Sequence, residues 1–321
     1  MKLISIVTPC FNEEENIDSL YHQIHTVFSK LPQYNYEHLF IDNASTDKTV
    51  ELIKKLAAKD TRVKLIVNVR NFGHIRSPMY AVLQASGDAV IGMASDLQDP
   101  PELISDFVAK WEEGYDVVVG VKPKSLENPL MFFIRRSYYR LIAKISDVPV
   151  IQNYTGFGLY DRKVIEVTRK LDDPYPYFRG LISELGFPVA QIEYIQPKRI
   201  RGITKNNFYT LYDIAMLGIT SHSKIPIRLA AMAGFALGLV SLAVSLVYAI
   251  LKFIYWDMFQ AGAAPVLIGV FFLASVQLFF IGILGEYVAA IHTQVLKRPL
   301  VIEKERVNFD TNFDPQDDSK K

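Results

Sequence analysis

Apolar residues follow two alternating patterns along the first 121 residues of the chain. Short runs of β-branched and aliphatic residues, typical of buried strands, occupy 4–8, 38–42, 63–68, 89–94 and 116–121. Between these runs the apolar residues recur at helical spacing, which predicts helices over 17–31, 47–59, 77–86 and 101–114. Strands and helices in alternation predict an α/β domain, with a mostly parallel sheet covered by helices on both faces.

Two far longer apolar runs follow in the last third of the chain. Residues 229–251 contain no ionisable side chain except Tyr248, and the second run extends over 258–291, interrupted by Glu286. A helix of about 20 residues crosses the ~30 Å hydrocarbon core of a bilayer, so each run is long enough to span a membrane. The pattern predicts a two-helix transmembrane hairpin rather than the buried helical hairpin of a soluble protein.

Basic residues on either side of these runs predict the orientation of the hairpin. The connecting loop carries one basic residue, Lys252, whereas the flanks carry Lys224, Arg228, Lys297, Arg298, Lys304 and Arg306. By the positive-inside rule, both ends of the hairpin face the cytoplasm. We therefore expect an integral protein of the inner or plasma membrane with both termini in the cytoplasm.

The same patterns divide the chain into four parts. We expect a cytoplasmic α/β domain over 1–205, a juxtamembrane interfacial helix within 206–228, two transmembrane helices within 229–291 and a cytoplasmic tail over 292–321. The polar residues 312–321 are expected to be disordered. Apolar surface on the hairpin could also support a homo-oligomer.

Composition excludes some classes of protein. The net charge is +1, so the chain has no overall basic field that would attract nucleic acid. Cys10 is the only cysteine, and no disulfide can form within the chain. The first residues lack the apolar core and cleavage site of a signal peptide, and they are better interpreted as a strand.

Polar residues cluster where the first four predicted strands end. Pro9, Asn12 and Glu14 follow the first strand, and the next three strands are followed by Asp42 and Asn43, by Arg70 and Gly73, and by Asp96. Singly, each has a conformational explanation: Asn12 and Glu15 could form a capping box, and Asp42 could be a turn residue. Together they predict a ligand site at the carboxyl edge of the sheet. The chain contains neither GxGxxG nor GxxxxGK[ST], so dinucleotide and P-loop sites lack support.

Six motifs carry a family resemblance: VTPCFNEEENI, FIDNASTDKT, RNFGH, SDLQDPPE, TGFGLYDR and RGITK. With the C-terminal hairpin, they resemble the inverting GT-A (Rossmann-like) glycosyltransferases of family 2. More narrowly, the chain resembles polyprenyl-phosphate glycosyltransferases related to dolichyl-phosphate mannose synthase and to bactoprenol glucosyltransferases. The resemblance covers nearly the whole chain and makes 1–205 the catalytic domain.

The resemblance implies roles for the residues at the strand ends. Pro9, Asn12 and Glu14 would line the nucleotide pocket, Asp42 would contact uracil or ribose, and Arg70 and Gly73 would lie near the base or diphosphate. Asp96 would bind Mg²⁺ or Mn²⁺ together with Gln98 and, as a further candidate, Asp99. Many relatives have Asp-Ala-Asp where this chain has Ala94-Ser95-Asp96, so one carboxylate is replaced. Magnesium binds through one or two carboxylates plus substrate phosphates, so a single Asp can suffice.

The implied reaction sets the requirements of the acceptor side. A phosphate nucleophile needs no general base, since its second pKa is near 6. Two anions must instead be brought together, which calls for cations. We assign Arg135, Arg201 and Lys205 to the acceptor phosphate, and Asp96, Gln98, Arg201 and Lys205 to catalysis. We expect Asp161 to be a helix N-cap rather than a base.

The implied function is transfer of a single sugar, with inversion, from a UDP-sugar to undecaprenyl or dolichyl phosphate at the cytoplasmic membrane face. Glucose is the favoured sugar. Transfer from GDP-mannose and a catalytically inactive membrane scaffold remain open alternatives. A processive polysaccharide synthase is disfavoured, because neither Trp111 nor Trp256 follows an arginine and only two spans are present.

Overall fold

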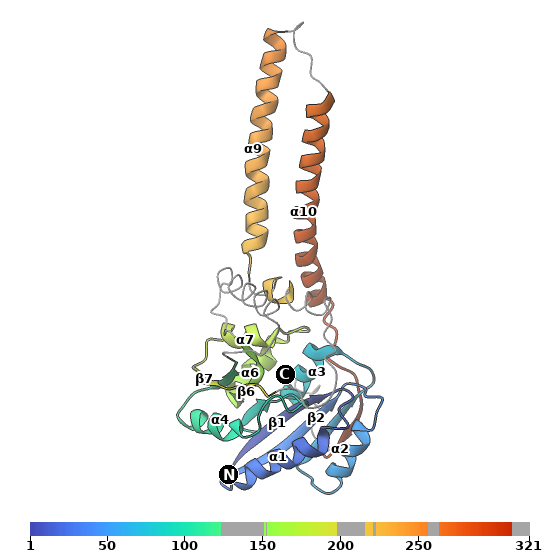
Figure 1. The fold of residues 1–321 in the computed structure, drawn as a ribbon, viewed down its shortest axis with the longest axis vertical. Helices are drawn as coiled ribbons and strands as arrows, with labels where there is room; N and C mark the ends of the chain where they lie inside the picture. Colours follow the sequence, from blue (N-terminus) through green and yellow to red (C-terminus); the bar gives the residue numbers. More distant parts are fainter. Residues whose placement is uncertain (123–150, 152, 198–215, 221–222, 256–262, 310–321) are drawn as a thin grey trace.

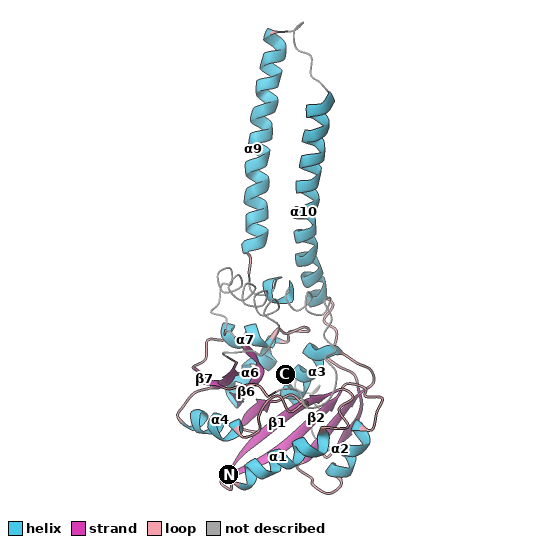
Figure 2. Ribbon diagram, in the orientation of Figure 1, coloured by secondary structure: helices cyan, strands magenta, loops and turns pink. Residues whose placement is uncertain are grey.

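The protein folds into an α/β domain from which two long helices extend (Figure 1). The computed structural model describes residues 1–122, 151, 153–197, 216–220, 223–255 and 263–309. All of its strands lie in the α/β domain, and the two long helices extend to one side of it (Figure 2).

An eight-stranded sheet with the order β7-β5-β6-β4-β1-β2-β3-β8 forms the centre of the domain. Its strands are β1 Lys2–Cys10, β2 Tyr34–Asp42, β3 Val63–Asn68, β4 Ala89–Gly92, β5 Val117–Val121, β6 Tyr154–Asp161, β7 Val189–Glu193 and β8 Glu303–Val307. β1 pairs in parallel with β2 and β4, β2 with β3, and β5 with β7. β6 and β8 run antiparallel to their neighbours. The prediction of a mostly parallel α/β sheet is confirmed.

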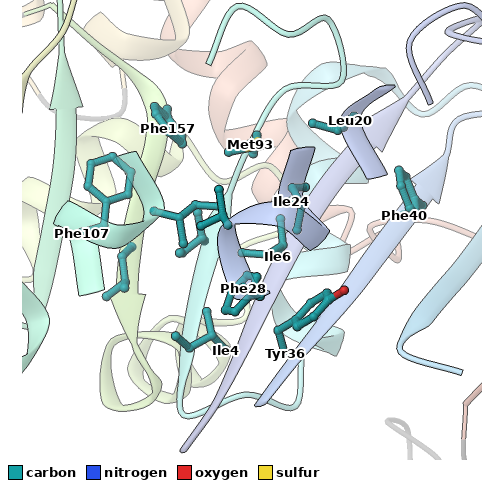
Figure 3. Packing of buried hydrophobic residues seen from close by; sticks show 14 of the residues in the cluster. Ile4, Ile6, Leu20, Ile24, Phe28, Tyr36, Phe40, Met93, Phe107 and Phe157 are labelled. Carbon is teal, nitrogen blue, oxygen red and sulfur yellow. The ribbon is translucent and has the colours of Figure 1, made fainter. Parts of the chain in front are cut away.

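Helices cover both faces of this sheet. They are α1 Ile17–Ser29, α2 Thr49–Ala57, α3 Gly73–Gln84, α4 Leu103–Glu112, α6 Arg162–Leu171 and α7 Phe178–Glu184. Strand residues alternate between the two faces. Ile4 and Ile6 of β1 therefore belong to the core cluster that includes Ile24 of α1 (Figure 3), whereas Val7 belongs to the cluster that includes Val82 of α3. Full burial of one such side chain contributes about 1.5–3 kcal/mol.

The start of the first helix differs from the prediction. α1 begins at Ile17 after Asn16, whose side chain forms no cap. Asn12, which was predicted to cap this helix, adopts a left-handed backbone conformation with φ of 57°. Its side chain bonds to the loop that follows β2, so the predicted capping box is wrong.

The two long helices are α9 Ile225–Ile254 and α10 Ala263–Val295. At 1.5 Å per residue, each of them exceeds the ~30 Å thickness of a membrane core. None of their most apolar stretches is buried within the protein, so they are not the core helices of a soluble domain. Both are long and apolar enough to cross a membrane as a hairpin.

The chain returns from α10 to the α/β domain and adds the edge strand β8. β8 pairs with β3, with Leu65 opposite Val307, and Arg306 of β8 donates hydrogen bonds to Gln84 (2.8 Å) and Tyr80 (3.1 Å) of α3. The sequence analysis did not predict this strand, because EKERV lacks an apolar run; charged residues are common on edge strands. Both ends of the hairpin are therefore attached to the same domain.

Candidate active site

The carboxyl ends of β1, β2, β3 and β4 lie at one edge of the sheet, because these parallel strands are neighbours in the order β4-β1-β2-β3. The loops that follow them cover residues 11–16, 43–48, 69–72 and 93–102. We call these loops, together with Pro9, Asp42 and Gly73, the strand-end edge. The sheet thus brings together the polar residues that the sequence predicted to meet there.

Asn12 and Glu14 connect the loop after β1 to the loop after β2. Asn12 accepts a hydrogen bond from the backbone N–H of Thr46 at 2.7 Å, and its own N–H donates to the Ser45 hydroxyl at 2.9 Å. Glu14 accepts from the N–H of Lys48 at 2.9 Å. Both side chains therefore hold the two loops together at the strand-end edge.

Asp42, the last residue of β2, has a buried carboxylate with one oxygen in use. Oδ2 accepts a hydrogen bond from the Ser45 N–H at 2.9 Å, whereas Oδ1 is buried without a partner among the described residues. Burial is the main cause of the raised pKa of Asp42. A buried acceptor without a partner costs free energy, and an N–H group of a ligand would satisfy it. Asp42 is therefore the clearest ligand-binding candidate at this edge.

Asn43 holds the loop after β3 in place. Its carbonyl oxygen accepts from the N–H of Phe72 at 2.8 Å, and its amide nitrogen donates to Asn71 at 2.9 Å and to the carbonyl oxygen of Gly73 at 3.1 Å. Gly73 has φ of 87°, a conformation that favours glycine. Arg70 lies over the Phe72 ring, 4.1 Å from its centroid, at the exposed rim. The sequence analysis noted Asn43 but gave it no role.

The loop after β4 carries the predicted metal ligands. The Asp96 carboxylate accepts from the backbone N–H of Gln98 at 3.2 Å. The buried Asp99 instead accepts from the Ala94 N–H at 3.1 Å and from the Tyr194 hydroxyl at 3.0 Å. These two hydrogen bonds fix Asp99 in the loop, and its role as a further metal ligand stays a prediction.

The remaining donor set fits a metal ion held largely by substrate phosphates. No group of three His, Cys, Asp or Glu side chains among the described residues could form an all-protein metal site. Magnesium commonly uses one or two carboxylates and completes its shell with phosphate oxygens and water. Asp96 can supply one such carboxylate.

A cavity of about 240 Å³ adjoins the strand-end edge. Pro9 and Ala94 line it on the strand side, and α3 and the segment 176–179 form its walls. We call it the α3–α7 cavity. It contains His74 and Arg179, which the sequence analysis did not assign, although His74 belongs to the motif RNFGH. No local pattern singles out Arg179, because only the packing of α7 against the sheet brings it there.

Three predicted residues, Arg135, Arg201 and Lys205, lie outside the residues that the structure describes. Asp161 caps α6 as predicted: its carboxylate accepts from the N–H of Lys163 at 2.9 Å. Its other oxygen accepts from the indole N–H of Trp111 at 2.7 Å.

Comparison with known proteins gives consistent matches over most of the chain. The family model described as Glycosyl transferase family 2 matches residues 5–168. The SfII prophage-derived bactoprenol glucosyl transferase of Shigella flexneri is 34% identical over 94% of this chain and 97% of its own length. The uncharacterized glycosyltransferase YkcC of Bacillus subtilis is 33% identical over 93% of this chain and 92% of its own length.

Among solved structures, glucosyl-3-phosphoglycerate synthase from Mycobacterium tuberculosis, in complex with Mn²⁺, UDP and phosphoglyceric acid, has a TM-score of 0.47 and 20% identity over 68% of this chain and 76% of that chain. The domain is of the GT-A type, with a mostly parallel mixed sheet and the strand-end edge described above. The family match and the relatives that cover more than nine-tenths of the chain show that this protein is a glycosyltransferase and belongs to glycosyl transferase family 2.

Proposed function

We propose that this protein transfers one glucose residue from UDP-glucose to a polyprenyl phosphate at the cytoplasmic face of the membrane. The observation that carries the proposal is the attachment of a family 2 transfer domain, through both of its ends, to an apolar hairpin. Relatives named bactoprenol glucosyl transferase match 94% of the chain, a share that reaches beyond the 5–168 family region. A hairpin of this kind would hold the domain beside a lipid acceptor.

Asp42 supports a nucleotide donor. Its unpartnered Oδ1 lies at the strand-end edge and can accept a hydrogen bond from the imide N–H of uracil. A guanine base also presents an N–H, so this contact is compatible with GDP-mannose as well. The names of the relatives favour glucose.

The reaction requires no general base in the protein. A phosphate oxygen of the lipid would form a bond to the anomeric carbon, and the bond from that carbon to the diphosphate oxygen would break, inverting the configuration. A bound divalent cation would neutralise charge on the departing diphosphate. Asp96 would bind this cation and thereby hold the loop after β4 at the diphosphate. Arg135, Arg201 and Lys205 are proposed to bind the acceptor phosphate. Their cationic side chains offset the repulsion between two anionic substrates.

The test is transfer of radiolabelled sugar from UDP-glucose to undecaprenyl phosphate by the full-length protein in detergent. We expect label in the lipid fraction, its loss with EDTA, and recovery with Mg²⁺ or Mn²⁺. Asp96→Asn should lower the rate by about 100-fold, the scale seen when a charge-stabilising group is removed. Asp106→Asn, on the exposed face of α4, is the matched control and should leave the rate unchanged.

Two outcomes would contradict parts of the proposal. Labelling from GDP-mannose but not from UDP-glucose would overturn the donor. Labelling that is insensitive to EDTA and to Asp96→Asn would retain the transfer and overturn the role of the metal.

A further inference from the structure

We propose that the α3–α7 cavity receives the phosphate end of the prenyl acceptor, with Arg179 as a further cation that binds the phosphate and His74 as a second donor. This inference rests on the proposed function and adds a subsite to it. Neither residue belongs to the acceptor set predicted from the sequence, which comprises Arg135, Arg201 and Lys205.

The position of the cavity suits a lipid substrate. Its walls include α3 and the start of α7, and both helices lie at the end of the domain that faces α9 and α10 (Figure 1). Its inner side is formed by Pro9 and Ala94 of the strand-end edge. A phosphate in the cavity would therefore lie between the membrane side of the domain and the donor.

The chemistry of the lining favours a prenyl phosphate over a sugar. Most of the lining is apolar, and it includes Ile75, Met79 and Phe157. A hexose would need several hydrogen-bond partners, since a buried hydroxyl without a partner costs free energy. The Asp99 carboxylate and the Tyr160 hydroxyl also line the cavity, and both are bonded within the protein: Asp99 accepts two hydrogen bonds, and Tyr160 donates to the carbonyl oxygen of Gly156. Few polar groups of the lining are therefore left to serve the hydroxyls of a hexose. Apolar walls instead match the first carbons of an isoprenoid chain.

Arg179 supplies the charge that a phosphate requires. Among the described residues it forms no ion pair with a carboxylate, and it is half-buried at the start of α7. The pKa of His74 is lowered, first by desolvation and second by the charge of Arg179. The imidazole is therefore neutral at pH 7, and it can still donate one N–H. A planar guanidinium with several N–H groups binds phosphate oxygens in a bidentate manner.

A second cavity provides a route from the hairpin. It has a volume of about 340 Å³ and lies between α7 and the base of α10. Leu181 of α7 and Ile291 of α10 line it, and it shares Tyr177 with the α3–α7 cavity. An isoprenoid chain could pass from α10 to Arg179 along Leu181, Ile291 and Tyr177. The polar residues Asp173, Glu184 and Gln294 line the same cavity.

The test compares Michaelis constants for the two substrates in the full-length protein, with farnesyl phosphate as the acceptor and UDP-glucose as the donor. Arg179→Gln should raise KM for farnesyl phosphate by about 10- to 100-fold, the scale of a lost charge-assisted hydrogen bond, and leave KM for UDP-glucose within about 2-fold. Arg179→Lys should recover part of this loss, because lysine keeps the positive charge but cannot bind two phosphate oxygens through a planar guanidinium. His74→Gln, at an exposed position, should raise the same KM by a smaller factor.

Arg228→Gln is the matched control, since Arg228 is an exposed cation in the first turn of α9 and outside the cavity. It should leave KM for farnesyl phosphate unchanged. An equal effect of Arg228→Gln and Arg179→Gln would indicate general attraction of anionic lipid and would overturn the subsite.

Direct binding separates failure of the subsite from failure of the proposed function. Calorimetry with farnesyl phosphate and with inorganic phosphate measures binding without turnover, and we expect farnesyl phosphate to bind more tightly. If the wild type transfers glucose and Arg179→Gln keeps the acceptor KM, the subsite is wrong and the function stands. If the wild type transfers glucose to no prenyl phosphate, the function is wrong. In that case, farnesyl phosphate binding that depends on Arg179 would still support the cavity as a prenyl-phosphate site, and binding that does not depend on it would overturn the site.

Discussion

The strand-end edge and the α3–α7 cavity adjoin each other but are built in different ways. At the edge, Asn12, Glu14 and Asn43 accept hydrogen bonds that join the loops. Among the described residues, the buried acceptors without a partner at the ends of these strands are Asp42 Oδ1 and Asn68 Oδ1. The cavity has apolar walls and two nitrogen-bearing side chains, His74 and Arg179, supplied by two different helices. A preorganised polar edge suits a nucleotide with a defined hydrogen-bond pattern. An apolar cavity with one permanent cation suits a lipid phosphate.

Of the three changes that follow, Asp42→Asn is expected to have the largest effect, and it should weaken binding of the donor but not of the acceptor. Asn has one acceptor oxygen, so it can serve either the Ser45 N–H or a ligand, but not both. We expect KM for UDP-glucose to rise by about 10- to 100-fold, with KM for the acceptor unchanged. Calorimetric binding of UDP to the full-length protein checks this. If Asp42→Asn changed only KM for the acceptor, the assignment of the donor to the strand-end edge would be wrong.

A decrease in pH should lower the stability of the folded domain through His38, a buried residue of β2. Burial lowers the pKa of His38 to about 3, and its Nε2 lies 3.0 Å from the Thr8 hydroxyl. The unfolded chain, with a His pKa near 6.5, binds more protons than the folded chain between pH 6.5 and 3. The contribution of neutral His38 to the free energy of unfolding is thus fully present above pH 6.5. Below this pH it falls by about 1.4 kcal/mol per pH unit, which is a loss of ~2 kcal/mol at pH 5.

Thermal unfolding of the full-length protein at pH 7 and pH 5 measures this loss, with His38→Gln as the control for the other titrating groups. The variant should be less stable at pH 7 and should show a smaller decrease between the two pH values. An identical decrease in both proteins would show that His38 is not responsible.

Arg306→Gln should have the smallest effect. It tests whether the packing of β8, the strand that follows the hairpin, affects donor binding at the strand-end edge. Arg306 of β8 contacts Gln84 of α3, and the N–H of Val69 donates to the carbonyl oxygen of Ile302 at 3.0 Å. Loss of the Arg306 hydrogen bonds should cost about 1–2 kcal/mol of stability and raise KM for UDP-glucose a few-fold.

Lys54→Gln provides the matched comparison for this variant. It breaks an ion pair of 2.6 Å with Glu305 on the same strand, and both side chains are about 40% exposed. Exposed ion pairs contribute at most about 1 kcal/mol to the free energy of unfolding, so KM for UDP-glucose should be unchanged in this variant. Equal effects of the two changes would indicate that any weakening of β8 is sufficient.

Local patterns in the chain were enough to predict the alternating strands and helices and the hairpin, because burial of apolar side chains imposes a period on each element separately. They also predicted that Asp42 and Asp96 would meet at one edge, since parallel strands place their carboxyl ends together. The N-cap role of Asp161 followed from its position before α6 in the same way.

Contacts between distant segments account for what these patterns could not predict. Asn12 forms hydrogen bonds with the loop after β2 instead of capping α1, because the sheet brings the two loops together. The charged β8 becomes a strand only because β3 offers an unpaired edge next to the end of α10. Arg179 lies 105 residues beyond His74 in the chain, and only the packing of α7 beside α3 makes the two residues walls of one cavity.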